Sequence, residues 1–250
     1  MVASGTIILR LGIRPRWSSF SASWQVLSRS TPIGVTYSVA ALILRADVIV
    51  LSWMVAAREV GYFAAANIPL VMIYVVSWLL GGVILPQMLS LVSNPSAMRE
   101  YSHRWIRVVL FVTVPVCLLQ FMFTPQLIQL LYGPEFASTG RLAAIMGLAV
   151  PFILANSVWL SRAIACGSTA SYLVPYVATG VLALLLDYGL GREFRGLGIA
   201  VGIVIREAVM FAMFAVIQTR PVDVRKAARN ATLSTSLVPA PDPSGNNLLS

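Results

Sequence analysis

Four ionisable side chains stand inside apolar runs that are long enough to cross a membrane. Arg45 and Asp47 lie in the run AALILRADVIVLSWMVA, and Arg206 and Glu207 lie in a second run near the C-terminus. An ionisable side chain at the centre of a bilayer costs about 2.5–3.5 kcal/mol on insertion scales, so such residues usually face the interior of a helix bundle or a wet cavity. All four are therefore candidate substrate-binding residues.

The spacing of these charges predicts their partners. Residues two apart on an α-helix point about 200° away from each other, so Arg45 and Asp47 do not neutralise one another by stacking. Arg45 and Arg206 each lie about 12 residues from the expected inner end of their helix, roughly 18 Å into the membrane. Two crossed ion pairs are expected at this shared depth, Arg45 with Glu207 and Asp47 with Arg206. The open alternative is that one arginine lines a cavity and holds a pyrophosphate bidentately.

Two amides complete the candidate set. Asn67 lies early in one apolar run and Asn156 lies late in another. Either amide could bind a sugar from a cavity wall, or it could bind a neighbouring helix and only fix the packing. Both interpretations stay open from the sequence.

The composition is that of an integral, all-α membrane protein. Of the 250 residues, 58% are hydrophobic and only 11% are charged, and the mean hydropathy is +0.83. The net charge of +9 comes from residues spread between the apolar runs. Membrane topology explains this spread better than nucleic-acid binding does. The two cysteines both lie in apolar runs and predict no disulfide framework.

The apolar runs predict six membrane-spanning helices. Each needs roughly 20 mostly apolar residues to cross the bilayer core. Pro115 and Pro125 predict that the third helix kinks, or ends near residue 124. Residues 1–32 are expected to form an amphipathic interfacial segment and residues 220–250 a disordered tail, on either side of a six-helix region at 33–219. The predicted spans are about 33–56, 60–86, 106–131, 141–165, 171–189 and 197–218.

The positions of the basic residues predict the orientation in the membrane, because cytoplasmic loops carry an excess of Lys and Arg. With both termini in the cytoplasm, the outer side receives only Arg58, Arg141, Arg192 and Arg195. The inner side then receives Arg10, Arg14, Arg16, Arg29, Arg99, Arg104, Arg107, Arg162, Arg220, Arg225, Lys226 and Arg229.

Three short stretches together resemble one known family. They are LRADVIVLSWMVAAREVGYFAAANIPL (44–70), VILPQMLSLV (83–92) and LIQLLYGPEFASTGRLAAIMGLAVP (127–151). In this order and spacing they are similar to the second half of Wzx/RfbX-type flippases for O-antigen and exopolysaccharide, in the multidrug/oligosaccharidyl-lipid/polysaccharide exporter superfamily. The resemblance runs from about 33 to 218 and includes GLGIAVGIVIREAV (196–209). The residues that match the family's turns and close helix contacts are Gly61, Phe63, Ala66, Pro86, Gly133 and Phe136.

The resemblance implies a two-lobed flippase-like fold of which this chain matches one six-helix lobe, the C-terminal one. It implies a multi-pass protein of the bacterial inner membrane that moves an oligosaccharide on undecaprenyl pyrophosphate to the outer leaflet. A second lobe would come from an N-terminal lobe or from another chain. Asn67 and Ile68 stand where some relatives that act on lipid-linked cell-wall precursors carry a charged pair. This departure argues against a lipid II substrate.

Other function classes find less support. The sequence has neither a phosphate-binding loop nor a group of carboxylates that would predict an enzyme, so no catalytic residue and no cofactor are expected. No metal site is expected either, because one histidine and two isolated cysteines do not make a closed metal site. Asp47 and Glu207 are taken as the only acidic residues in the spans. Two alternatives remain: a cation-coupled multidrug exporter that uses Asp47, and a non-transporting membrane remnant or scaffold.

Overall fold

The computed structural model describes residues 45–167 and 169–219, together with single helical positions before them. The chain divides into two compact units, Met1–Val35 and Thr36–Ser250, and every labelled helix belongs to the second. The predicted tail at 220–250 lies outside the described residues. So does the predicted amphipathic segment at 1–32, apart from Trp24, Leu27 and Thr31.

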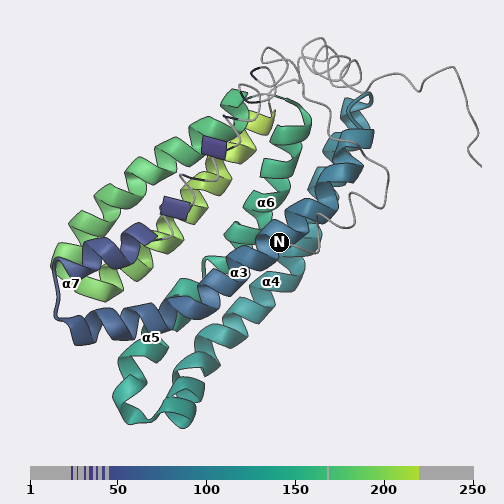
Figure 1. Cartoon of the computed structure of the whole chain (residues 1–250). Helices are drawn as coiled ribbons and strands as arrows, with labels where there is room; N and C mark the ends of the chain where they lie inside the picture. The colour runs from purple at the N-terminus through teal and green to yellow at the C-terminus, as the bar shows by residue number, and fades with distance from the viewer. Residues whose placement is uncertain are drawn as a thin grey trace, which may run out of the picture. The chain divides into compact units, whose positions relative to one another are not determined.

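The described part of the second unit contains helices and turns and no strand (Figure 1). After a helical stretch at 45–52 the labelled elements are α3 (Ala57–Ser90), α4 (Pro95–Tyr132), the short 3-10 helix η1 (Pro134–Phe136), α5 (Ala137–Gly147), α6 (Val150–Ala165) and α7 (Thr169–Thr219). The element α7 is two helices, because Arg195 has φ 53° and ψ −135° and interrupts it. Figure 1 shows its two halves side by side.

Four stretches of the described residues are long and apolar enough to cross a membrane, and one of them contains both halves of α7. The protein is therefore a multi-pass helical membrane protein. The first predicted span, 33–56, is described continuously only from Arg45, so the count of six stays a prediction. Its described helix ends at Ser52, earlier than expected, where a turn leads into α3.

The helices differ from the predicted spans in further places. The predicted end of the second span at Pro86 is wrong, because α3 continues through this proline to Ser90. α4 begins at Pro95 rather than near 106, because the side chain of Asn94 caps it by accepting from the Ala97 amide and Pro95 suits the first turn. It continues through Pro125 to Tyr132, so an end near residue 124 is wrong. The predicted span 141–165 is broken at residues 148–149, between α5 and α6.

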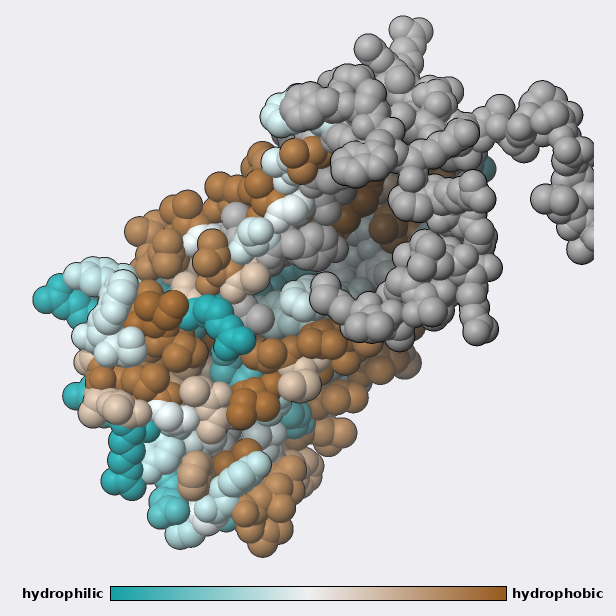
Figure 2. All heavy atoms as spheres, in the orientation of Figure 1, coloured by the Kyte–Doolittle hydropathy of each residue, from teal (hydrophilic) through white to brown (hydrophobic). Residues whose placement is uncertain are grey.

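α5 and α6 form the centre of the lobe. Both contact α3, α4 and α7. In the stretch Pro134–Ala165, 78% of the most apolar 18-residue segment is buried, whereas 17% of the corresponding segment is buried in α3 and in α4. The apolar core packs side chains from 45–52, α3, α5, α6 and the second half of α7, including Leu51, Phe63, Met146, Ile153 and Ile203. Figure 2 shows hydrophobic residues over much of the visible face, as expected for a surface that meets lipid or another lobe.

Candidate functional site: a buried ion cluster beside a polar cavity

Asp47 and Arg206 form a buried ion pair, as the sequence predicts. Arg206 Nη1 lies 2.5 Å from Asp47 Oδ1, and the two side chains are 3% and 1% exposed. The pair joins the helix at 45–52 to the second half of α7. Because both charges are removed from water, each depends on the other, and loss of one partner would leave an uncompensated charge in the lobe.

Glu207 binds two neutral side chains instead of Arg45. Tyr74 Oη on α3 donates to Oε1 at 2.7 Å, and Asn156 Nδ2 on α6 donates to Oε2 at 3.1 Å. Arg206 Nε lies 3.8 Å from the same carboxylate.

The predicted pair of Arg45 with Glu207 is wrong. Arg45 is exposed and has no ion pair among the described residues. The cause is the helical geometry: the rotation that turns Asp47 toward α7 turns Arg45, two residues earlier, to the opposite side of the helix.

Asp187 is a further buried carboxylate that the sequence-based set lacks. It lies in the first half of α7, inside the predicted span 171–189, and it is 1% exposed. Neither of its oxygens accepts a hydrogen bond from a donor side chain, and its carboxyl group lies within hydrogen-bonding reach of Asp47 and near Arg206. Three carboxylates therefore share one guanidinium. The signal was available, since an aspartate in the apolar run LALLLDYGL is as unusual as Asp47 in its own run.

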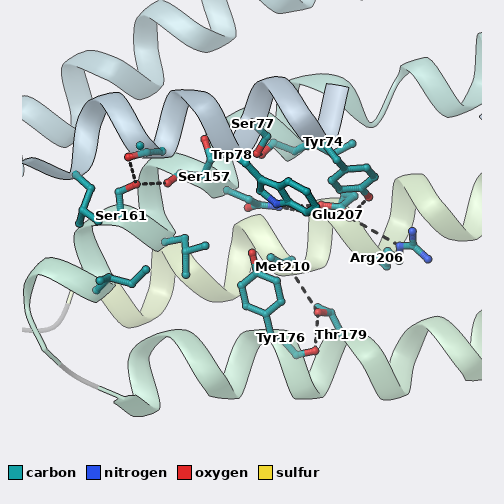
Figure 3. A pocket seen from close by; sticks show the side chains of 17 residues that line it. Tyr74, Ser77, Trp78, Ser157, Ser161, Tyr176, Thr179, Arg206, Glu207 and Met210 are labelled. Atoms are coloured by element: carbon teal, nitrogen blue, oxygen red, sulfur yellow. Dashed lines mark hydrogen bonds and ion pairs between the residues drawn. The ribbon is translucent and has the colours of Figure 1, made fainter. Parts of the chain in front are cut away.

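A cavity of about 180 Å³ lies beside the cluster, between α3, α6 and both halves of α7 (Figure 3). Asn156, Arg206 and Glu207 line one part of it. Ser77, Ser157, Ser161 and Thr179 add hydroxyl groups to its wall, and Tyr74, Trp78 and Tyr176 add aromatic rings. The sequence did not predict this cavity, because single serines in apolar helices are common and only the packing shows which of them face one space.

The remaining predicted residues lie elsewhere. Asn67 is buried in α3, its Oδ1 has no hydrogen-bond partner, and it does not line the cavity. Asp47 lies behind Arg206 rather than on the cavity wall. The structure thus brings Asp47, Asn156, Arg206 and Glu207 into one network and leaves Arg45 and Asn67 out of it. Among the described residues, no group of three His, Cys, Asp or Glu side chains is placed to hold a metal ion.

The turns that carried the family resemblance pack closely in the fold. Gly133 has φ 97°, a conformation that suits glycine, where α4 ends. A Cβ at Gly198 would collide with the backbone of Leu190, so this glycine lets the halves of α7 approach each other. Tyr62 packs edge-on against Phe136, 5.5 Å between ring centres. These contacts hold the helix ends together in the fold.

Comparison with known proteins places the chain in a family. It belongs to the polysaccharide biosynthesis proteins, whose family model matches residues 1–140. The solved structure of the lipid II flippase MurJ, in an inward closed conformation, is similar to it with a TM-score of 0.67 and 16% sequence identity. The match covers 92% of this chain and 51% of MurJ, so the chain spans about half the length of that protein. At this identity the likeness shows the fold alone. No curated protein matches the chain.

Proposed function

We propose that this chain forms one lobe of a flippase that moves a lipid-linked oligosaccharide across the bacterial inner membrane. The observation that carries the proposal is the match to the polysaccharide biosynthesis family over residues 1–140. The MurJ-like fold supports it, because MurJ is itself a flippase and this chain corresponds to about half of its length. The substrate would cross between this lobe and a second one, from a longer form of the chain or from another chain.

The candidate residues take different roles in this proposal. Arg45 is exposed and is the guanidinium that is free to meet the pyrophosphate of undecaprenyl pyrophosphate. Arg206 is committed to Asp47 and maintains the lobe. Asn156 and Glu207 face the cavity, and Asn67 is a further amide at a buried position of α3. Both termini would be cytoplasmic.

A flipping assay in proteoliposomes tests the proposal. The vesicles contain the full chain alone, or with the N-terminal lobe of a family member, and a fluorescent undecaprenyl-pyrophosphate disaccharide. Dithionite added outside destroys the fluorescence of outer-leaflet probe only. We expect complete loss of fluorescence when both lobes are present, and protection of the inner-leaflet probe when the chain is alone.

Fluorescent phosphatidylcholine in the same vesicles is the matched control, since it must stay protected if transport is selective. Flipping of both probes would indicate a general lipid leak and would contradict the proposal. Protection of both probes with two lobes present, after correct insertion has been verified, would also contradict it.

A cation-coupled exporter is the second candidate, and Asp187 is the observation that favours it. Its buried carboxyl group accepts from no donor side chain and lies within hydrogen-bonding reach of the Asp47 carboxylate, an arrangement that suits the binding of a proton or a monovalent cation. In the same vesicles an exporter would accumulate a cationic dye when a proton or sodium gradient is imposed. The lipid-linked substrate would stay in place.

A further inference from the structure

Four serine and threonine hydroxyl groups on the cavity wall already donate their protons to backbone carbonyls. Ser157 Oγ donates to the Leu154 carbonyl at 2.8 Å, and Ser161 Oγ donates to the Ser157 carbonyl at 2.8 Å. Ser77 Oγ donates to the Ile153 carbonyl at 3.3 Å, and Thr179 Oγ1 to the Pro175 carbonyl at 2.7 Å. A hydroxyl has one proton and two lone pairs. What these four side chains can still offer a ligand is acceptor oxygens.

The polar end of the cavity has the same character. Asn156 is 3% exposed, and its Nδ2 donates to Glu207 while its Oδ1 has no partner. Glu207 is an acceptor in any case. Arg206 keeps unbonded donors at Nε and Nη2, but its charge is balanced by Asp47 and it lies near two further carboxylates. An anion would meet an excess of negative charge here, so the cavity does not suit a phosphate.

The rest of the wall is apolar and aromatic. Trp78, which is 49% exposed, lies in Figure 3 near Tyr74 and across from Tyr176 and Met210. Such rings pack against the C–H faces of a ligand. The volume of about 180 Å³ gives room for one small ring.

From this complementarity we propose that the cavity between α3, α6 and α7 binds a single sugar ring, whose hydroxyls donate to Ser157, Ser161, Asn156 and Glu207 and whose apolar face packs on Trp78. This inference rests on the proposed function, and it adds that the lobe itself recognises one sugar unit of the substrate. It also implies two separate binding sites: the sugar binds in the cavity, and the pyrophosphate binds elsewhere.

Saturation-transfer NMR on the full chain in phosphatidylcholine nanodiscs tests the inference. The probes are the methyl glycosides of glucose, galactose and N-acetylglucosamine at millimolar concentration. We expect ring-proton signals for at least one glycoside. Loss of one neutral hydrogen bond weakens binding about fivefold, so the signal should fall by at least that factor in Ser157→Ala/Ser161→Ala, and similarly in Trp78→Leu.

Two matched controls come from residues outside the cavity. Ser102 is a buried serine of α4 that bonds to its own helix in the same way, through the Met98 carbonyl at 2.7 Å, and Trp53 is 79% exposed. Ser102→Ala and Trp53→Leu should leave the signal unchanged. If the double serine variant does not fold, Trp78→Leu at its half-exposed position still tests whether the glycoside binds in the cavity.

The inference would be overturned by no signal for any glycoside, by equal signals in cavity and control variants, or by displacement of the glycoside by inorganic pyrophosphate. Displacement by tetramethylammonium alone would make the cavity a cation site and would overturn it as well. Glycoside binding without flipping by the two-lobed assembly refutes the proposed function only. Flipping that survives the loss of glycoside binding refutes the sugar site only.

Discussion

Arg206 is the side chain on which the buried charges depend. Asp47, Asp187 and Glu207 all lie close to it, and it has the one cationic group that the described residues bring to this cluster. Glu207 also has Tyr74 and Asn156 as donors, whereas Asp47 accepts from the Arg206 guanidinium and has the carboxyl group of Asp187 beside it. Removal of Arg206 therefore affects more groups than removal of either partner.

We expect Arg206→Gln to lower the free energy of unfolding by about 3 kcal/mol or more, because it leaves buried carboxylates without a counter-charge. Asp47→Asn should cost less, since Arg206 keeps Glu207 nearby. Chemical unfolding in mixed micelles measures both. The matched control is Arg195→Gln, whose pair with Glu59 is exposed and is worth at most about 1 kcal/mol. Equal losses for Arg206→Gln and Arg195→Gln would show that the buried cluster does not stabilise the lobe.

At the scale of elements, α4 and α5 approach each other through two glycines. A Cβ at Gly140 would lie 2.8 Å from the Cα of Pro125. A Cβ at Gly147 would collide with the amide of Gln120, which donates to the Ala143 carbonyl. Backbone cannot yield as a side chain can, so the contact at Gly140 sets the distance between the two helices.

Gly140→Ala should therefore destabilise the protein, by about 1–3 kcal/mol, as over-packing does. Gly61→Ala is the matched control, because nothing lies within 4 Å of the added carbon and alanine favours a helix over glycine by roughly 0.5–1 kcal/mol. Thermal unfolding of the two variants in the same detergent should give shifts of opposite sign. A stabilised Gly140→Ala protein would mean that α4 and α5 are further apart than described.

Elements and contacts differ in how well the sequence predicts them. Hydropathy identifies the long helices because each must be apolar over a bilayer thickness, and matched depth correctly pairs Asp47 with Arg206. It does not show that α4 starts at Pro95, since a polar helical turn has no apolar signal. Nor does it show the bonds of Glu207 to Tyr74 and Asn156, which depend on how α3 and α6 rotate against α7.

At the scale of the lobe, the helix ends gather into two groups. The starts of α3 and α5 and the break in α7 meet through Arg195 with Glu59 and through Thr139 with the Tyr62 carbonyl. At the other group, Cys166 lies against Met98 at 3.6 Å. The second group carries Arg99, Arg104 and Arg107, and from this positive charge we propose that it lies on the cytoplasmic side.

Single-cysteine labelling tests this orientation. In a background with Cys117→Ala and Cys166→Ala, a membrane-impermeant maleimide should label Glu135→Cys in intact cells, because η1 belongs to the outer group. Ser96→Cys, at the start of α4, should be labelled only after permeabilisation. Reversed labelling of the two positions would invert the topology, and with it the direction assigned to transport.

The single-residue break at Arg195 has a consequence for how α7 is inserted into the membrane. With no loop between its halves, α7 is suited to enter the bilayer as one helical hairpin during biosynthesis. Asp187 and Arg206, on opposite arms of that hairpin, interact electrostatically, so these two polar groups would enter the hydrocarbon side by side rather than separately. Asp47, which is synthesised earlier, would already lie in the membrane and could pair with Arg206.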